Sequence, residues 1–248
     1  KERVRSSYEA YDFQAAYQAL LNFAVVDLSS LYVDVVRDRL YCDGKESRRR
    51  RSAQTALFHI LDALVRMLAP LIPFTVDEVY SFMPGEKAVS VHRLEFQAQH
   101  PEWLEADLEQ KWSRLLGIRN ETLRVLESMR RSGTIGAPLE AQVAIGFPQG
   151  SANGAQQMVR SNIGHLKDLF IVAGVELLSD AEATRIQSLD NGEVFALDDG
   201  GVARVLSNPP LVITGRHAPG IKCQRCWTYF DDGGDPELCP RCRAVVRA

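Results

Sequence analysis

Four of the five cysteines lie in two Cys-x-x-Cys pairs near the end of the chain, Cys223–Cys226 and Cys239–Cys242, separated by 12 residues. Each pair places two thiolates on one face of a tight turn, and together the pairs supply the four sulfurs that suit a tetrahedral zinc ion. A closed shell of four sulfurs leaves no position for water. We therefore predict one zinc ion with a structural rather than a catalytic role.

Disulfides or an iron–sulfur cluster are the alternatives for these four thiols. The charged start of the chain, Lys1 to Arg5, is unlike a secretory signal, which favours metal over disulfides and predicts a cytoplasmic protein. The segment is short and has little core of its own, so metal binding is expected to supply much of its folding energy. Cys42 stands apart and is predicted to be a thiol with no role.

The elements that position these residues belong to an ordinary globular chain. It has 248 residues, of which 46% are hydrophobic and 25% are charged, a length that suits two or three domains. The formal net charge of -3 creates no overall positive field, so any nucleic-acid surface must be a local patch. No apolar run of 18 or more residues stands out, and no membrane span is expected.

The first block is predicted to be an all-α bundle. Apolar spacing without glycine or proline predicts a helix over residues 8–41, and Ser47 is the expected N-cap of a second helix over about 48–69. Pro70 and Pro73 are expected to break that helix. Thr75 with Glu78 fits a capping box that opens a third helix, which ends at Pro84-Gly85.

The residue pattern changes in the second block and indicates a small α+β domain. A helix over about 107–131 begins acidic and ends with two arginines, which complements the helix dipole. Beyond it we predict strands at 141–147, 169–178 and 211–214, a helix at 155–168, and a hairpin of 193–197 with 202–206. The predicted domains are 1–106, 107–215 and the four-cysteine module 216–248, with the least specific pattern at about 148–210.

These motifs resemble a known family. The segments His217–Trp227 and Leu238–Cys242 are similar to the C-terminal zinc finger of bacterial isoleucyl-tRNA synthetases, and a related finger ends the formamidopyrimidine-DNA glycosylases. The stretches Tyr11–Tyr17, Ser52–Thr55 and Leu68–Tyr80 resemble the helical anticodon-binding domain of the same synthetases. Lys111-Trp112 through Ala141 resembles the stretch that follows it. The likeness touches nearly the whole chain, in the right order.

The resemblance implies a monomeric, tRNA(Ile)-binding portion of a class I synthetase. The His-x-Gly-His and Lys-Met-Ser-Lys-Ser motifs of such enzymes do not occur in the chain. The catalytic domain, which binds ATP and isoleucine, and the editing domain would then lie elsewhere in the same synthetase. We expect the chain to position tRNA for aminoacylation and to be inactive alone, with no catalytic residues of its own.

Two groups of residues are predicted to contact tRNA, whose unpaired bases stack on aromatic and guanidinium planes while its phosphates need cations. Arg225 and Trp227 flank a metal ligand, which would hold an indole face rigidly for stacking. Alternatively, Trp227 packs inside the finger or against the neighbouring domain, and Arg225 is merely solvated. A run of four arginines opens the helix after Ser47. Lys45, Arg48 and Arg49 could bind phosphate there, or their side chains could simply be solvated.

The sequence alone leaves other functions open. The basic residues of the helix near 111–131, such as Arg114, Arg124 and Arg131, favour a solvated face over a phosphate contact. The finger alone also fits a formamidopyrimidine-DNA glycosylase-like repair protein, but the N-terminal proline nucleophile of those enzymes is missing here. A structural docking module that uses zinc as a staple, or a valyl or leucyl synthetase, are further alternatives.

Overall fold

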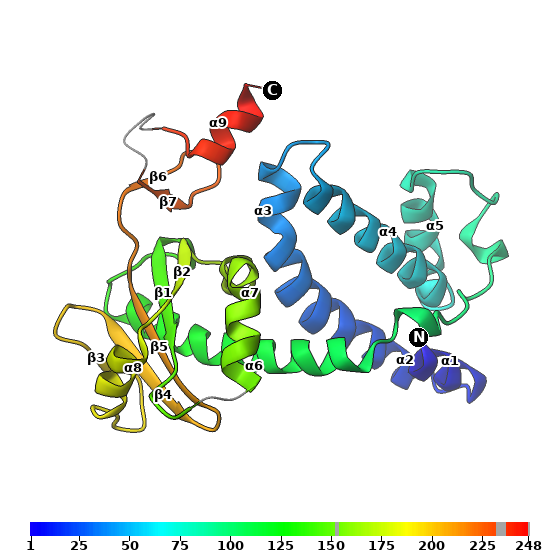
Figure 1. The fold of residues 1–248 in the computed structure, drawn as a ribbon. Coiled ribbons are helices and arrows are strands. Elements are labelled where there is room, and N and C mark those ends of the chain that lie inside the picture. The colour runs from blue at the N-terminus through cyan, green and yellow to red at the C-terminus, as the bar shows by residue number, and fades with distance from the viewer. Residues whose placement is uncertain (152–153, 232–236, 248) are drawn as a thin grey trace. The chain divides into compact units, whose positions relative to one another are not determined.

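The computed structural model describes residues 1–151, 154–231 and 237–247. The chain forms two compact units, Lys1–Leu104 and Glu105–Ala248 (Figure 1). The first unit is helical, and the second contains a small mixed sheet and the cysteine cluster. The three-domain division predicted from the sequence, with boundaries after 106 and after 215, stays a prediction.

The first unit consists of helices joined by short connections. In chain order they are α1 (Glu2–Glu9), α2 (Phe13–Asn22), the π-helical η1 (Phe23–Val33), α3 (Asp34–Cys42), α4 (Arg48–Leu68), α5 (Pro73–Phe82) and the 3₁₀ turns η2 (Val91–Arg93) and η3 (Pro101–Trp103). A core cluster of Val65, Ala69, Val76, Tyr80, Met83 and Val91 joins α4, α5 and η2.

The predicted helix over 8–41 is wrong at its start. The chain breaks after α1 because Tyr11 takes a left-handed φ of 58°, and Asp12 then caps α2 by accepting a hydrogen bond from the Ala15 N–H at 2.9 Å. From Phe13 onward the helix runs without a break through α2, η1 and α3 to Cys42. The break makes α1 a separate element with its own packing.

The start of α4 is as predicted and the start of α5 is not. Ser47 Oγ accepts a hydrogen bond from the Arg50 N–H at 3.5 Å, as an N-cap should. Helix α5 instead begins at Pro73, so the capping box expected at Thr75 is wrong. Proline suits the first helical position because its missing N–H has no partner there anyway. Pro73 therefore starts a helix where it was expected to end one.

The helical run Phe13–Cys42 combines an apolar composition with little burial. Its length and its hydropathy, 1.6 over the best 18-residue window, are enough to cross a membrane by those two criteria, and 11% of that window is buried. One such helix is weak evidence, because a mostly buried core helix of a soluble protein or a signal sequence near the N-terminus passes the same test. None of the eleven residues of η1 is buried within the described structure. Much of the apolar surface of this helix is thus uncovered in the first unit.

The second unit is built on helix α6 (Ala106–Arg131) and a five-stranded sheet in the order β2-β1-β5-β4-β3. The strands are β1 (Ala141–Gly146), β2 (Gly174–Leu177), β3 (Phe195–Ala196), β4 (Val202–Ser207) and β5 (Pro210–His217). Strand β2 pairs with β1 in parallel, and the other pairs are antiparallel. The remaining helices of the unit are η4 (Pro138–Glu140), α7 (Gly154–Phe170), α8 (Asp180–Gln187) and α9 (Pro240–Val246).

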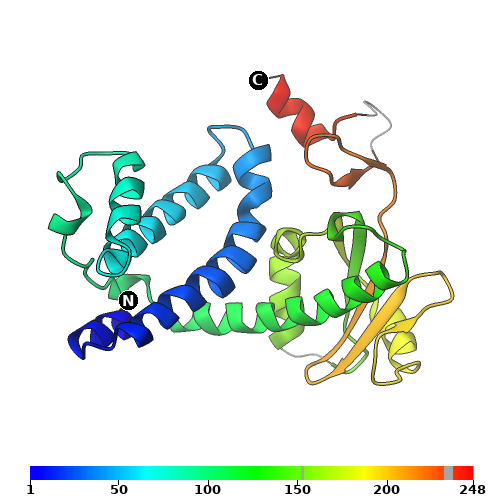
Figure 2. The same cartoon turned by 180° about the vertical axis from the view of Figure 1, so that it is seen from behind.

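Helices α6 and α8 cover opposite faces of this sheet. A Cβ added at Gly215 of β5 would lie 2.6 Å from Met129 Sδ of α6, so α6 approaches the sheet closely there. On the opposite face of β5, Val212 packs in a cluster with Ala183 and Ile186 of α8. Figure 2 shows α6 lying across the strands.

Most elements predicted for the second unit are present, with two differences. The strand predicted over 169–178 is shorter, because Leu169 and Phe170 still belong to α7 and the strand begins at Gly174. Helix α8 was not predicted, although Ser179 caps it through the Glu182 N–H at 3.2 Å. After β5 the chain enters a two-stranded ribbon, β6 (Ile221–Lys222) and β7 (Tyr229–Phe230), that carries the first pair of cysteines.

Candidate metal centre and nucleic-acid-binding residues

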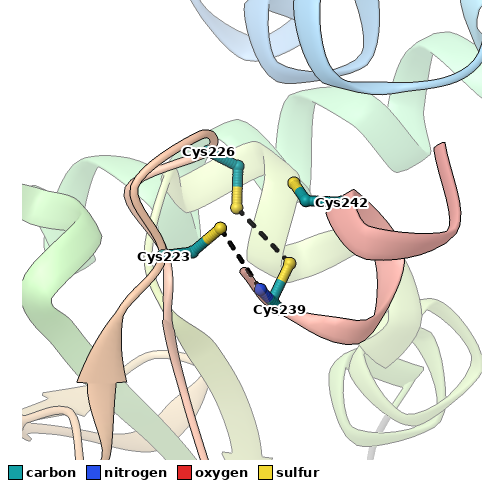
Figure 3. A group of neighbouring side chains, drawn as sticks. All are labelled: Cys223, Cys226, Cys239 and Cys242. Atoms are coloured by element: carbon teal, nitrogen blue, oxygen red, sulfur yellow. Dashed lines mark hydrogen bonds between the residues drawn. The ribbon is translucent and has the colours of Figure 1, made fainter. Parts of the chain in front are cut away.

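The four predicted ligands come together in one buried cluster. Figure 3 shows the sulfurs of Cys223 and Cys226, from the turn after β6, facing those of Cys239 and Cys242 at the start of α9. All four Sγ atoms lie within 4.8 Å of one another. Cys226 Sγ and Cys239 Sγ are 3.7 Å apart, and all four cysteines are free rather than disulfide-bonded.

This geometry fits a zinc ion. With Zn–S bonds of about 2.3 Å, the edge of a regular tetrahedron of sulfurs is about 3.8 Å, close to the 3.7 Å between Cys226 Sγ and Cys239 Sγ. A disulfide needs about 2.05 Å between the two sulfurs. Among the described residues the cluster consists of cysteines alone, and such an all-sulfur shell is typical of structural sites.

Local backbone hydrogen bonds hold the first cysteine pair in a tight turn. The Trp227 N–H donates to the Cys223 carbonyl at 2.9 Å, and the Cys223 N–H donates to the Thr228 carbonyl at 3.0 Å. The Cys239 N–H donates to Cys223 Sγ at 3.4 Å, which ties the second pair to the first. The module is anchored to its own unit by Lys222, whose Nζ lies 3.2 Å from Glu140 Oε1.

The same contacts set the acidity of the thiols. Burial raises the pKa of Cys223, but donation from the backbone N–H groups of Cys239, Cys226 and Arg225 outweighs it and lowers that pKa to about 6. Burial raises the pKa values of Cys239 and Cys242. A bound divalent cation favours the thiolate at every ligand, so it would offset the cost of burying these sulfurs.

Trp227 occupies an unusual position directly after the second ligand. Its φ of 63° is left-handed, a conformation that suits glycine and is disfavoured for a bulky residue by roughly 1–2 kcal/mol. The indole is 63% exposed, so packing inside the finger does not explain it. The backbone of Trp227 therefore lies in a hydrogen-bonded turn, and most of the surface of its side chain is available.

Arg225 lies on the other side of Cys226 and faces the cluster. Its Nη1 donates to Cys242 Sγ at 3.6 Å, and burial of the residue is intermediate. A guanidinium in this position helps to balance the negative charge of a thiolate ligand and fixes its orientation. Arg225 thus supports the metal ligands directly, while its role in binding RNA stays a prediction.

The arginine run at the start of α4 is divided between internal partners and solvent. Arg49 Nε is 3.8 Å from the buried Asp43 carboxylate, and Arg50 Nη1 donates to the Asp43 carbonyl at 3.1 Å. Arg51 pairs with Glu46 at 2.9 Å. Lys45 and Arg48 are exposed, and within the described part of the chain neither belongs to an ion pair.

Sequence reasoning missed the role of Asp43. Its place before Gly44 marked it only as a turn residue. In the structure its buried carboxylate accepts from Ser47 Oγ at 3.2 Å and lies near Arg49, so it offsets the cation repulsion at this helix start. The local signal was an acidic residue four positions before an N-cap serine.

Three arginines of α6 pair with glutamates of the same helix, whereas the sequence favoured a merely solvated face. Arg130 and Arg131 both donate to Glu127, and these hydrogen bonds lower the pKa of that carboxyl to about 2. Arg124 Nε lies 3.6 Å from Glu121.

The comparisons with known proteins agree with this geometry. A family model described as the anticodon-binding domain of tRNA ligase matches residues 1–145. The chain belongs to this family. A second model, a zinc finger found in FPG and IleRS, matches residues 220–245 and so contains all four cysteines.

Several curated isoleucine–tRNA ligases are similar to nearly the whole chain. The protein of Syntrophotalea carbinolica is 40% identical over 248 residues, which is 98% of this chain and 24% of that protein. The proteins of Desulforudis audaxviator and Geobacter sulfurreducens are 38% and 34% identical over 251 residues and 25% of their length. The resemblance to isoleucyl-tRNA synthetases is thus confirmed. The chain spans about a quarter of the length of these relatives.

Proposed function

We propose that this chain grips the anticodon stem-loop of tRNA(Ile) and positions that tRNA for ATP-dependent aminoacylation by a catalytic domain outside residues 1–248. The anticodon-binding family match over 1–145 and the isoleucine–tRNA ligase relatives support this function. The cysteine cluster holds one structural zinc ion, and ATP and isoleucine bind in the catalytic domain. The chain alone is then inactive in aminoacylation.

The exposed indole of Trp227 carries the proposal. Anticodon bases are unpaired and stack on aromatic side chains, and each such contact is worth roughly 1–3 kcal/mol. A stacking platform must be exposed before binding and held in place, because ordering a mobile side chain costs free energy. Trp227 meets the first condition, since it is 63% exposed, and the hydrogen bond from its N–H to the Cys223 carbonyl fixes its backbone within the first cysteine turn.

Lys45 and Arg48 supply a second contact in the proposal, with the phosphate backbone. Both side chains are exposed at the turn between α3 and α4, and the nearby acidic groups Asp43 and Glu46 are engaged by other arginines. Arg49 contributes less, because its guanidinium already faces Asp43. Cations free of internal partners gain most from phosphate, since no existing pair must be broken.

The DNA-repair alternative rests on the finger alone. The finger family includes proteins of both kinds, but the match over residues 1–145 is to tRNA ligases and favours RNA. A purely structural docking role would leave the strained, exposed Trp227 without a purpose.

Binding of a fluorescent tRNA(Ile) transcript to the purified chain tests the proposal. We expect binding that weakens when a chelator removes zinc and returns when zinc is restored, with weaker binding of a transcript carrying another anticodon. A duplex containing an oxidised purine is the control for the repair alternative. Equal affinity for both transcripts, or preference for the damaged duplex, would contradict anticodon recognition.

A further inference from the structure

The arginine run at the start of α4 is accompanied by two carboxylates. From Asp43 to Arg51 the sequence contains five cations and two acidic residues, Asp43 and Glu46. Consecutive residues of a helix are about 100° apart around its axis, so the arginines at 48–51 point to different sides of the helix start. A single RNA strand lies on one side and cannot contact all four. The internal partners of these arginines therefore decide which of them remain available to phosphate.

Asp43 binds two of the arginines to the fold. It is buried, and its carboxylate accepts a hydrogen bond from Ser47 Oγ at 3.2 Å and lies 3.8 Å from Arg49 Nε. Its carbonyl accepts from Arg50 Nη1 at 3.1 Å. Removing the cation from a buried carboxylate is costly, so a phosphate that drew Arg49 away would leave Asp43 uncompensated. Arg49 and Arg50 thus stay with the fold.

The pair of Arg51 with Glu46 differs because it lies at the surface. Arg51 Nη1 is 2.9 Å from Glu46 Oε2, and the two side chains are 67% and 73% exposed. An ion pair this exposed is weak, so a phosphate can take the place of the carboxylate. The phosphate must first displace Glu46, and the displaced carboxylate then repels it at short range. Glu46 therefore lowers the affinity of Arg51 for phosphate.

Lys45 and Arg48 have no such competitor. Both side chains are exposed, and among the described residues neither forms an ion pair. A phosphate contact carries no sequence information, whereas contacts to bases do. Each arginine that a carboxylate withholds from phosphate lowers the affinity for RNA of every sequence. Withholding arginines therefore limits how much of the protein is occupied by non-cognate RNA, which is present in excess over any one tRNA.

We propose that Glu46 is a specificity-determining residue that pairs with Arg51 and so restrains sequence-independent RNA binding at the start of α4. The contacts that remain for phosphate are those of Lys45 and Arg48. Asp43 acts in the same way on Arg49 from inside the turn. This role rests on the proposed function, because it requires RNA phosphate at this helix start.

A purely structural role for Glu46 makes a different prediction. A carboxylate just before an N-cap offsets the positive end of the helix dipole and the charge of the nearby arginines. If that were its only role, Glu46→Gln would lower the Tm slightly and leave RNA binding unchanged. The slope of log K against log salt separates the two roles, because it counts phosphate contacts.

Salt titrations of a double-variant cycle test the role of Glu46. The cycle compares the unaltered chain with Glu46→Gln, Arg51→Gln and the double variant, each with tRNA(Ile) and with an unstructured uridine oligonucleotide. In Glu46→Gln we expect the slope to steepen by about 0.7–0.9 for both RNAs, which is one more phosphate contact, and the affinity to rise about two- to fivefold. In the double variant the slope should return to that of the unaltered chain, because the released guanidinium is gone.

Glu78→Gln is the matched control. It removes the same charge from an exposed position on α5 of the same unit, and within the described part of the chain Glu78 forms no ion pair. This variant should leave the slope and the affinity unchanged. Thermal unfolding of every variant shows whether the helical unit is intact.

Three results would overturn the role of Glu46. An unchanged slope in Glu46→Gln means that Arg51 gains no phosphate contact. An equal change in Glu78→Gln assigns the effect to net charge, and a steeper slope that persists in the double variant assigns the new contact to another residue. Equal affinity for tRNA(Ile) and a transcript with another anticodon would instead contradict the proposed function alone, because the uridine oligonucleotide still reports on Glu46.

Discussion

Replacing Trp227 should separate RNA binding from folding of the zinc module. Trp227→Gly removes the indole and places the residue best suited to a φ of 63° at that position. Trp227→Ala also removes the indole but keeps a Cβ in the left-handed conformation. The two variants therefore share the expected loss of stacking and differ in backbone strain.

The magnitudes follow from the exposure of this side chain. Because 63% of Trp227 is exposed, roughly 90 Å² of a tryptophan surface of about 250 Å² is buried, worth at most about 2 kcal/mol. Relief of the left-handed strain returns about 1–2 kcal/mol in the glycine variant. Trp227→Gly should thus leave the module within about 1 kcal/mol of its original stability, and Trp227→Ala should be less stable than Trp227→Gly by about 1 kcal/mol.

Loss of a stacked base costs about 1–3 kcal/mol, so the Kd for tRNA(Ile) should rise roughly 5- to 150-fold in both variants. Trp227→Phe keeps an aromatic face and should recover most of the affinity. The assay is tRNA binding at fixed salt, with zinc content and chelator competition measured on the same samples. An unchanged Kd in Trp227→Gly with zinc retained would refute the stacking argument, since nothing else would then distinguish this indole.

Four other perturbations have expected outcomes. Elemental analysis should find about one zinc per chain, and Cys242→Ser or a chelator should remove it and unfold the terminal module while the helical first unit keeps its circular dichroism. Arg48→Gln should weaken tRNA binding and reduce the slope of log K against log salt by about 0.7–0.9, whereas Arg51→Gln, whose partner is Glu46, should leave the slope unchanged. The folded-state pKa of Glu127, about 2, lies below the ordinary value of 4.5, so this carboxylate should stabilise the fold above about pH 4.5 and lose that contribution as the pH falls toward 2. In Glu127→Gln the Tm should therefore fall less steeply with pH over that window. Gly146→Ala should lower the stability of the second unit by about 1–3 kcal/mol in chemical denaturation, because its Cβ would lie 2.7 Å from Ala183 Cβ, while Gly117→Ala, with open space around it, should be neutral or stabilising.

The cysteine cluster could be predicted from the sequence because the spacing of the cysteines determines the local structure. A Cys-x-x-Cys turn fixes two sulfurs within four residues, and the structure places the two pairs within bonding range of one ion. The N-cap at Ser47 and the extent of α6 followed from equally local rules. Such features depend little on distant parts of the chain.

The predicted helix boundaries were wrong where the same local residue pattern is compatible with two different structures. Proline can end a helix or occupy its first position, and Pro73 does the second. Tyr11 takes a left-handed φ that a bulky residue disfavours, so the break between α1 and α2 gave no glycine or proline signal. Only packing of Val4 and Tyr8 against α4 explains why the chain turns there.

The sequence alone also did not show which of the candidate RNA-binding residues are free to bind RNA. Four consecutive arginines are equivalent as sequence, and only the fold shows that Asp43 and Glu46 engage three of them and leave Arg48 exposed. For Trp227 the sequence left both stacking and packing open, and its exposure argues against packing inside the finger. A residue that strains the backbone and buries little of its surface contributes little to the fold, so its role must be sought outside the fold. The proposed partner of this exposed indole is an unpaired base, because bases stack on aromatic side chains.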